Sequence, residues 1–318
     1  MERTVDAHDG WIRAIINGGD GLVSCADDGK VIWWSMKDAD SHSVLRAESE
    51  PFVSLLSWKS CILAACGNGK TYMIDANDSK LVGTLEGHLY GVSTLALGDG
   101  EDCSTCFSGS MDQTIKKWDL HSKECIETYY PPNQANVTAL LVVGSQLYAG
   151  DARGLISVWD TNTDTLLRTL KGHSDVIYHI LAYENTLYTC SEDRNVRMWK
   201  IDSGAWFYTL KKSHSDGIIH LQHMVSENMV QENISAIDAG SPEGGSEQTA
   251  TRLELQTLFT TSHDGSLKGW NISGIFEYIH EVERVKEEEQ RRIQAALDEI
   301  AAASKGKGKK KGGKKGKK

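Results

Sequence analysis

The chain has 318 residues, of which 40% are hydrophobic and 25% charged, and its formal net charge is −10. These values are typical of a globular chain that is long enough to bury a full core. No apolar run approaches the roughly 20 residues that a membrane-spanning helix needs, and the first ten residues lack the apolar core of a signal peptide. The seven cysteines are scattered and odd in number, as in a reduced intracellular protein. We therefore expect a protein of the cytoplasm, the nucleus or both, the nucleolus included, that is not secreted.

Charge is divided unevenly along the chain. Residues 305–318 contain nine lysines and no acidic residue, so the preceding 304 residues carry about −19 (−10 − 9 = −19). An acidic body with a basic tail predicts two surfaces that bind different partners.

A spacing of His, Asp and Trp recurs along the first 270 residues. In segment 107–119, FSGSMDQTIKKWD, two alternating stretches flank a turn, which is a hairpin signal. The turn Asp112 lies six residues before Trp118, and His88 lies upstream. Three other units keep the same offsets. The complete sets are His8, Asp28 and Trp34; His88, Asp112 and Trp118; His173, Asp193 and Trp199; and His214, Asp264 and Trp270.

Two further units keep only part of this spacing. One ends at Ile74, with Asn68 at the Asp position, and the other ends at Trp159, with Asn133 at the His position and Arg153 at the Asp position. The six units end at residues 34, 74, 118, 159, 199 and 270, which are 40, 44, 41, 40 and 71 residues apart. A period of about 40–45 residues is that of a four-stranded propeller blade.

Gly-His, a turn Asp and Trp-Asp at this period resemble the WD-repeat family. The resemblance implies an all-β, six-bladed WD-repeat β-propeller over residues 1–272, in which residues 3–6 complete the last blade. Seven blades, the commoner number in the family, is the alternative. Residues 225–252 show neither strand alternation nor turn signals, so we predict a disordered insertion in the last blade rather than a seventh blade.

The remainder of the chain differs from the repeats. Residues 275–304 predict one long amphipathic helix, which packs on the propeller or on a partner. Residues 305–318 predict a disordered tail. We consider three roles for the tail: a solubilising or nuclear address, non-specific RNA contact, and contact with another anionic surface such as a microtubule or membrane face. Its candidate polyanion-binding residues are Lys305, Lys307, Lys309, Lys310, Lys311, Lys314, Lys315, Lys317 and Lys318.

The His, Asp and Trp sets are interpreted as structural rather than catalytic. In WD-repeat blades they form a buried hydrogen-bonded network, and four copies in one chain argue against a single active site. The second and fourth units, which end at Ile74 and Trp159, lack the complete set. We therefore expect these two, blades 2 and 4, to be the less stable blades. No phosphate-binding loop, nucleophile motif or HExxH is present. We therefore predict no enzyme activity, no cofactor and no small-molecule substrate.

A zinc site is the alternative for one cluster. The spacing of Cys103, Cys106, His121 and Cys125 is compatible with zinc. We predict no metal, because two of the cysteines fall on strands that hold their side chains apart.

The family geometry implies a binding rim built from the turns that hold each His and each turn Asp. Aromatic and Arg residues are the usual anchors of interfaces. The candidate rim residues are Trp11, Arg13, Phe52, Tyr90, Met111, Tyr178, Glu192, Arg194 and His263. The insertion, helix and tail are expected on the opposite rim. The first hypothesis is thus a non-catalytic scaffold that binds protein partners within a larger complex. The alternative is an RNA- or ribosome-associated factor that is docked by the C-terminal helix and the Lys tail.

Overall fold

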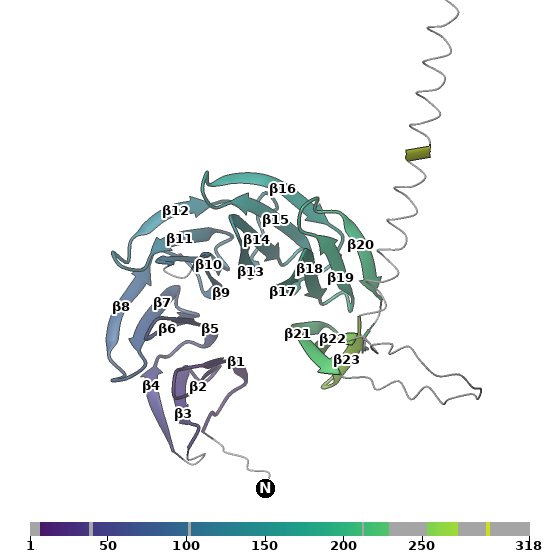
Figure 1. The fold of residues 1–318 in the computed structure, drawn as a ribbon. Helices are drawn as coiled ribbons and strands as arrows, with labels where there is room; N and C mark the ends of the chain where they lie inside the picture. Colours follow the sequence, from purple (N-terminus) through teal and green to yellow (C-terminus); the bar gives the residue numbers. More distant parts are fainter. Residues whose placement is uncertain are drawn as a thin grey trace, which may run out of the picture. The chain divides into compact units, whose positions relative to one another are not determined.

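A computed structural model describes residues 7–37, 41–100, 103–211, 213–228, 253–272 and 291–292. The described part consists almost entirely of β-strands arranged as six blades (Figure 1). Blade 1 contains β1 (Ile12–Asn17), β2 (Gly21–Ala26), β3 (Lys30–Ser35) and β4 (His42–Ala47). Blade 2 contains β5 (Phe52–Trp58), β6 (Cys61–Cys66), β7 (Lys70–Asp75) and β8 (Leu81–Glu86). Blade 3 contains β9 (Val92–Leu97), β10 (Thr105–Ser110), β11 (Ile115–Asp119) and β12 (Cys125–Tyr129).

The later blades follow the same plan. Blade 4 contains β13 (Val137–Val143), β14 (Gln146–Asp151), β15 (Leu155–Asp160) and β16 (Thr165–Lys171). Blade 5 contains β17 (Ile177–Tyr183), β18 (Thr186–Ser191), β19 (Val196–Lys200) and β20 (Trp206–Leu210). Among the described residues, blade 6 has three strands: β21 (Ile218–Asn228), β22 (Leu253–Ser262) and β23 (Leu267–Asn271). The sequence prediction of six blades is thereby confirmed.

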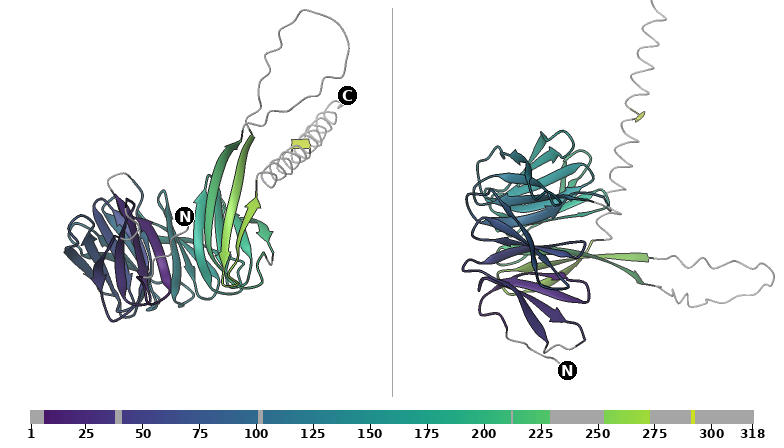
Figure 2. Two further views of the ribbon diagram at one scale, coloured as in Figure 1. Left: turned by 90° about the horizontal axis from the view of Figure 1, so that it is seen from below. Right: turned by 90° about the vertical axis from the view of Figure 1, so that its left-hand side faces the viewer.

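Each of blades 1–5 is a simple antiparallel meander. The strands pair in sequence order, and the innermost strands of neighbouring blades contact one another, β1 with β5, β5 with β9, β9 with β13 and β13 with β17. Figure 2 shows the twist of these sheets from two other sides. In all five, the register between the third and fourth strands shifts by one residue, which leaves a bulge in the outermost strand. The extra residues are Leu45, Val82, Ile126, Leu167 and Phe207.

The core lies between blades rather than within them. Four clusters of buried side chains each combine residues of two consecutive blades. The cluster between blades 3 and 4, for example, joins Phe107 and Tyr129 to Leu147 and Trp159. A single blade therefore buries its apolar faces only when it has neighbours, which is why the sequence pattern must repeat.

The turn between the second and third strands has the same backbone conformation in all six blades. The residue after each Asp position has positive φ: Gly29, Gly69, Gln113, Gly154, Arg194 and Gly265. Four of these six are glycine, which adopts this conformation without steric cost. The turn places the preceding Asp next to the His of the same blade.

Three histidines lie at the seam between blades 5 and 6. The rings of His179 on β17 and His220 on β21 have centroids 4.2 Å apart, and His223 stacks on Tyr183 at 3.8 Å. Burial, together with a smaller effect of nearby His220, lowers the pKa of His179 to about 3. Burial also lowers the pKa values of His220 and His223. The neutral imidazoles therefore pack as apolar rings in this seam.

The chain divides into two compact units, Met1–His223 with Phe259–Lys268, and Met224–Leu258 with Gly269–Lys318. Strand β21 continues to Asn228, so residues 225–228 belong to a strand and not to the predicted insertion. The rest of the predicted insertion, the strand at residues 3–6 and the tail lie outside the described residues. Of the predicted helix, Arg291 and Arg292 are described, and both are helical. In the described part of the chain, no helix has the length and hydropathy to cross a membrane.

Candidate protein-interaction rim

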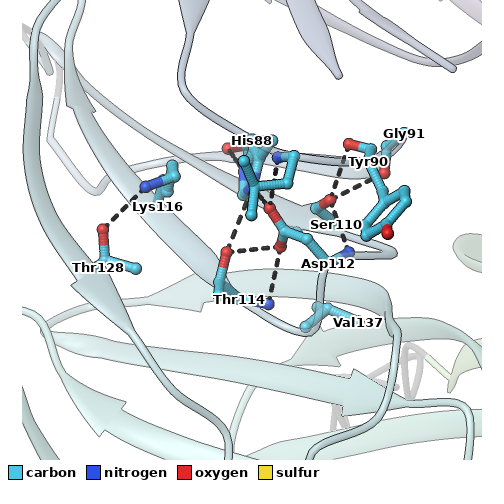
Figure 3. Close-up of polar contacts among 12 residues, drawn as sticks. His88, Tyr90, Gly91, Ser110, Asp112, Thr114, Lys116, Thr128 and Val137 are labelled. Atoms are coloured by element: carbon cyan, nitrogen blue, oxygen red, sulfur yellow. Dashed lines mark hydrogen bonds and ion pairs between the residues drawn. The ribbon is translucent and has the colours of Figure 1, made fainter. Parts of the chain in front are cut away.

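The predicted His, Asp and Trp sets form in the structure. In blade 3, His88 Nδ1 lies 2.8 Å from Asp112 Oδ2, and His88 Nε2 lies 2.7 Å from Ser108 Oγ, which accepts a hydrogen bond from the Trp118 indole at 2.7 Å. Figure 3 shows Asp112 between His88 and Thr114, whose hydroxyl donates to Asp112 at 2.6 Å. The network connects the turn that begins the blade with its second and third strands.

The other complete sets repeat this geometry. The His–Asp distances are 3.0 Å for His8 and Asp28, 2.8 Å for His173 and Asp193, and 3.3 Å for His214 and Asp264. The hydroxyls that face the second His nitrogen belong to Ser24, Thr189 and Thr260. The sets are thus side-chain networks that fix four turns on one edge of the blades. We call the edge that carries these turns the His rim.

Electrostatics keeps the blade 3 set in one charge state near neutral pH. Burial would raise the pKa of Asp112, but hydrogen bonds from Thr114, the Leu89 amide and His88 together hold it below its usual value. Burial lowers the pKa of His88, against the opposing effect of Asp112. The set therefore pairs an ionised carboxylate with a neutral imidazole, and both are buried and hydrogen-bonded.

Blade 4 contains a substitute network that the sequence analysis missed. Asp151, two residues before the expected position, accepts hydrogen bonds from the Asn133 side-chain amide at 2.9 Å and from the Arg153 and Leu155 amides. Asp151 is buried. Blade 4 thus lacks the complete His, Asp and Trp set, as the sequence indicated, but has a different side-chain network in its place. In the sequence, this pair differs from the complete sets in two ways: Asn133 replaces the His, and Asp151 lies two residues before the usual Asp position.

Blade 2 has only a local arrangement at this place. The Asn68 side chain accepts from the Lys70 amide at 3.0 Å and donates to the Tyr72 hydroxyl at 2.9 Å. These contacts span at most four residues and do not connect the blade to the preceding turn. Blade 2 is therefore less well connected at the His rim than the other described blades.

The most preorganised rim group lies on blade 1. The Trp11 side chain is 74% exposed, and the Arg13 guanidinium lies 5.5 Å from the centroid of its ring. Asp27 holds Arg13 with two hydrogen bonds of 2.6 Å, one to Nε and one to Nη2. This fork fixes the arginine over one face of the indole, while the Trp11 side chain as a whole stays largely exposed. The sequence analysis did not identify Asp27, although it immediately precedes Asp28 of the set.

Other predicted rim residues gather on blades 3, 5 and 6. Tyr90 and Met111 are exposed and lie on two different turns of blade 3. The Met111 amide donates a hydrogen bond to the Gly91 carbonyl and so connects the two turns. The rings of Tyr178 and His263 have centroids 5.7 Å apart, and burial and the neighbouring Glu192 raise the pKa of Tyr178.

Arg194 is exposed on the turn of blade 5. Leu89, which the sequence analysis missed, is also exposed, beside His88.

Phe52 is a correction to the predicted rim. Its side chain is 0% exposed and packs against Tyr72, with centroids 5.7 Å apart. As the first residue of β5 it belongs to the core between blades 1 and 2. At the start of β5, this apolar residue therefore faces the neighbouring blade and not the solvent.

The four residues with zinc-like spacing are spread over blade 3. Cys106 is buried on β10, opposite Trp118 on β11, which is in turn opposite the exposed Cys125 on β12. The two cysteines are thus two strands apart, about 10 Å at the usual strand spacing. The described residues contain no cluster of three or more His, Cys, Asp or Glu that could hold a metal ion.

Comparisons with known proteins agree with this geometry. The profile of the family "WD domain, G-beta repeat" matches residues 1–35, 79–119 and 164–200, which contain the sets of blades 1, 3 and 5. The solved structure titled "Structure of U3-55K" superposes with a TM-score of 0.65 over 85% of this chain and 80% of that chain, at 18% sequence identity. The crystal structure of RRP9 WD40 repeats superposes with the same TM-score of 0.65 and 18% sequence identity, over 85% of this chain and 78% of that chain. The chain is a six-bladed β-propeller that contains WD repeats. WD-repeat propellers generally act as scaffolds for protein interactions and not as enzymes.

Curated relatives of this WD-repeat protein have diverse names. It is 29% identical over 194 residues to the human kinesin-like protein KIF21A, covering 56% of this chain and 11% of the relative. It is 28% identical over 163 residues to the pre-mRNA-splicing factor cwf17 of Schizosaccharomyces pombe, covering 50% of this chain and 47% of the relative. The chain thus spans less than half the length of these relatives. The blade 6 set lies outside the matched residues of the family profile, because 50 residues separate His214 from Asp264.

Proposed function

We propose that this WD-repeat propeller is a non-catalytic scaffold that binds a protein partner on its His rim. The group formed by Trp11, Arg13 and Asp27 carries this proposal. Exposed Trp and Arg side chains are enriched among the residues that dominate binding energy. Here the arginine is already fixed by two hydrogen bonds, so little side-chain freedom is lost when a partner binds.

The remaining rim residues support a binding surface that extends over several blades. Tyr90, Met111 and Leu89 of blade 3 are exposed, and Tyr178, Glu192 and His263 form a second polar and aromatic group. Because the buried sets fix the turns that carry these residues, the surface is presented with little reorganisation on binding. We expect the partner to contact both groups.

The test compares partner recovery for two exposed-tryptophan variants. Trp11→Ala combined with Arg13→Ala should abolish recovery of protein partners in an affinity purification followed by mass spectrometry. Trp206→Ala is the matched control, because Trp206 is 51% exposed but lies on the outermost strand β20 and not on the His rim. Equal loss of partners in both variants, or no loss in the first, would contradict the proposal.

The second candidate function is an RNA- or ribosome-associated factor of the nucleus or nucleolus. The nine lysines of residues 305–318 support it, because cations that neutralise phosphates release counterions and give affinity without sequence preference. One curated relative is named a pre-mRNA-splicing factor. Deletion of residues 305–318 should then remove co-purifying RNA and flatten the salt dependence of RNA binding. Unchanged RNA recovery after the deletion would count against this function.

A further inference from the structure

A cavity of about 320 Å³ lies where blades 1 and 2 meet, at the strand ends opposite the His rim. Trp33 lines it, and its indole packs against the backbone of Gly21, where a Cβ atom would come within 2.6 Å of the ring. Asp20, Lys59 and Ala76 also line the cavity. It thus combines an aromatic side chain, one carboxylate and one ammonium group with the backbone of two hairpins.

At the same rim, the next three seams are each crossed by a cation of the protein itself. In every case a Lys or Arg side chain of one blade donates to a backbone carbonyl of the adjacent blade. The bonds are Lys123 Nζ to the Val82 carbonyl at 2.7 Å, Lys117 Nζ to the Thr161 carbonyl at 2.7 Å, and Arg168 Nη2 to the Ile201 carbonyl at 2.5 Å. The seams between blades 2 and 3, 3 and 4, and 4 and 5 are closed in this way.

The equivalent positions at the seam of blades 1 and 2 hold no cation. Trp33 precedes the last residue of its repeat, Trp34, as Lys117 precedes Trp118. The indole of Trp33 therefore stands where a lysine side chain crosses to the next blade in the third seam.

The other two cationic positions are occupied by serines. Ser43 pairs with Trp33 in the sheet of blade 1, as Arg168 pairs with Val158 in blade 4. Ser79 has the same place in its hairpin as Lys123, five residues after the end of the repeat, and both have positive φ, 60° and 64°. None of the three positions therefore supplies a cation to this seam.

The acceptor position is nevertheless kept. Ala76 occupies the place of Thr161 and Ile201, because the amide of each donates to the turn between the first two strands of its own blade. The acceptors are the carbonyls of Ser60 at 2.9 Å, Ser145 at 2.8 Å and Asn185 at 3.0 Å, respectively. Ala76 lines the cavity where a cation would meet its carbonyl.

We infer that this cavity binds the side chain of a lysine or arginine that comes from outside the blades. The Trp33 ring offers a face to the cation, Asp20 supplies the opposite charge, and the Ala76 position supplies the carbonyl that the sibling seams use. Among the described residues that line the cavity, Lys59 alone carries an ammonium group, and this group lies 5.2 Å from the centroid of the Trp58 ring. The side chain belongs either to a partner or to one of the tail lysines, because both sources present the same kind of cation.

The experiment follows Trp33 in the full chain by fluorine NMR. All nine tryptophans are replaced by 5-fluorotryptophan, and the Trp33 signal is assigned with Trp33→Phe. An acetylated, amidated Gly-Gly-Arg-Gly-Gly peptide should shift this signal saturably. The control peptide, which has Glu in place of Arg in the same sequence, should not shift it. Asp20→Asn should weaken binding about two- to fivefold, as expected for one exposed ion pair.

Ser43→Arg provides the sharpest test, because it places an arginine at the position of Arg168 and should occupy the cavity from within. Peptide binding should then be lost while the fold is kept, and Asp78→Asn on the same rim should leave binding unchanged. Binding of the Glu peptide instead, or undiminished Arg-peptide binding in Ser43→Arg and Asp20→Asn, would overturn the inference.

A last arm distinguishes the sources of the cation. If the tail is the occupant, replacing its nine lysines by glutamine should tighten binding of the Arg peptide. If a partner supplies the cation, that replacement should leave the affinity unchanged. Trp11→Ala combined with Arg13→Ala should not affect peptide binding to the cavity. The proposal for this cavity and the proposal for the His rim are therefore tested independently.

Discussion

The seam between blades 5 and 6 should lose stability as pH falls below about 6.5. His179 has its pKa lowered to about 3 in the folded protein, whereas an unfolded histidine titrates near 6.5. Between these values the unfolded chain binds more protons, so protonation favours unfolding. The contribution is present in full above pH 6.5 and is lost as pH falls towards 3.

The size of this effect follows from the pKa difference. With values of 6.5 and 3, the free energy of unfolding should fall by about 0.8 kcal/mol at pH 6 and about 2 kcal/mol at pH 5, relative to pH 8. His220 and His223, which face His179 and Tyr183 from β21, should add to this loss, because burial lowers their pKa values too. Glu184 opposes the shift of His223.

The protein itself supplies the substitution for the test. The residues at the position of His179 in blades 1, 2 and 4 are Ala14, Ser54 and Ala139, each just after the same register shift. His179→Ala therefore places a residue that this strand position already uses. Urea unfolding followed by tryptophan fluorescence at pH 8, 6 and 5 would measure the free energy of unfolding.

The decisive quantity is the change in the free energy of unfolding between pH 8 and pH 5, and not its value at a single pH. His179→Ala should reduce the loss between pH 8 and pH 5 by about 2 kcal/mol. His121→Ala, which removes an exposed histidine of blade 3, should keep the wild-type slope. An unchanged slope in His179→Ala would refute the assignment of the pH dependence to this seam.

Three further predictions concern the sets and the thiols. His88→Ala should lower the free energy of unfolding by about 3 kcal/mol, because Asp112 and Ser108 lose a buried partner, whereas Asn68→Ala in blade 2 should cost about 1 kcal/mol; a smaller loss for His88→Ala would contradict the structural role of the sets. Hydrogen exchange should be fastest in blade 2, intermediate in blade 4 and slowest in blades 3 and 5, and maximal protection of blade 2 would disprove this order. A thiol reagent should modify exposed Cys125 first and partly exposed Cys103 second, because the other five cysteines are buried and burial raises their thiol pKa values; fast reaction of Cys106 or Cys190 in the native protein would be inconsistent with these cores.

Much of the fold was predictable because the repeats align on a few fixed offsets. The offset of six positions from each Asp to its Trp places the Asp in one turn and the Trp on the third strand, so the complete sets appeared directly in the sequence. The insertion in blade 6 did not hide the pattern, since His214 and Asp264 keep their local surroundings. Seam contacts between blades were not predictable, because they depend on how successive sheets pack.

The errors have the same physical origin. Phe52 was expected on the rim from its place near a turn, but as the first residue of β5 it packs in the core between blades 1 and 2. Asp151 was missed because the offset argument looks only at one position, while a carboxylate two residues earlier reaches the Asn133 side chain and the Leu155 amide. The Arg13–Asp27 fork was missed because it joins two residues of no repeated spacing. Single-position patterns identify networks that repeat and overlook those that occur once.

The bulged outermost strands have a consequence for crowded assemblies. A flat outer strand exposes a row of free amides and carbonyls that can template pairing with another copy. In blades 1–5, one extra residue interrupts that row, and each of the five is apolar. A bulge bends the strand and breaks the regular pairing pattern, so copies held at high local concentration do not extend one another's sheets. Deleting Ile126 would restore the uninterrupted edge in blade 3 and should make the protein aggregate through it.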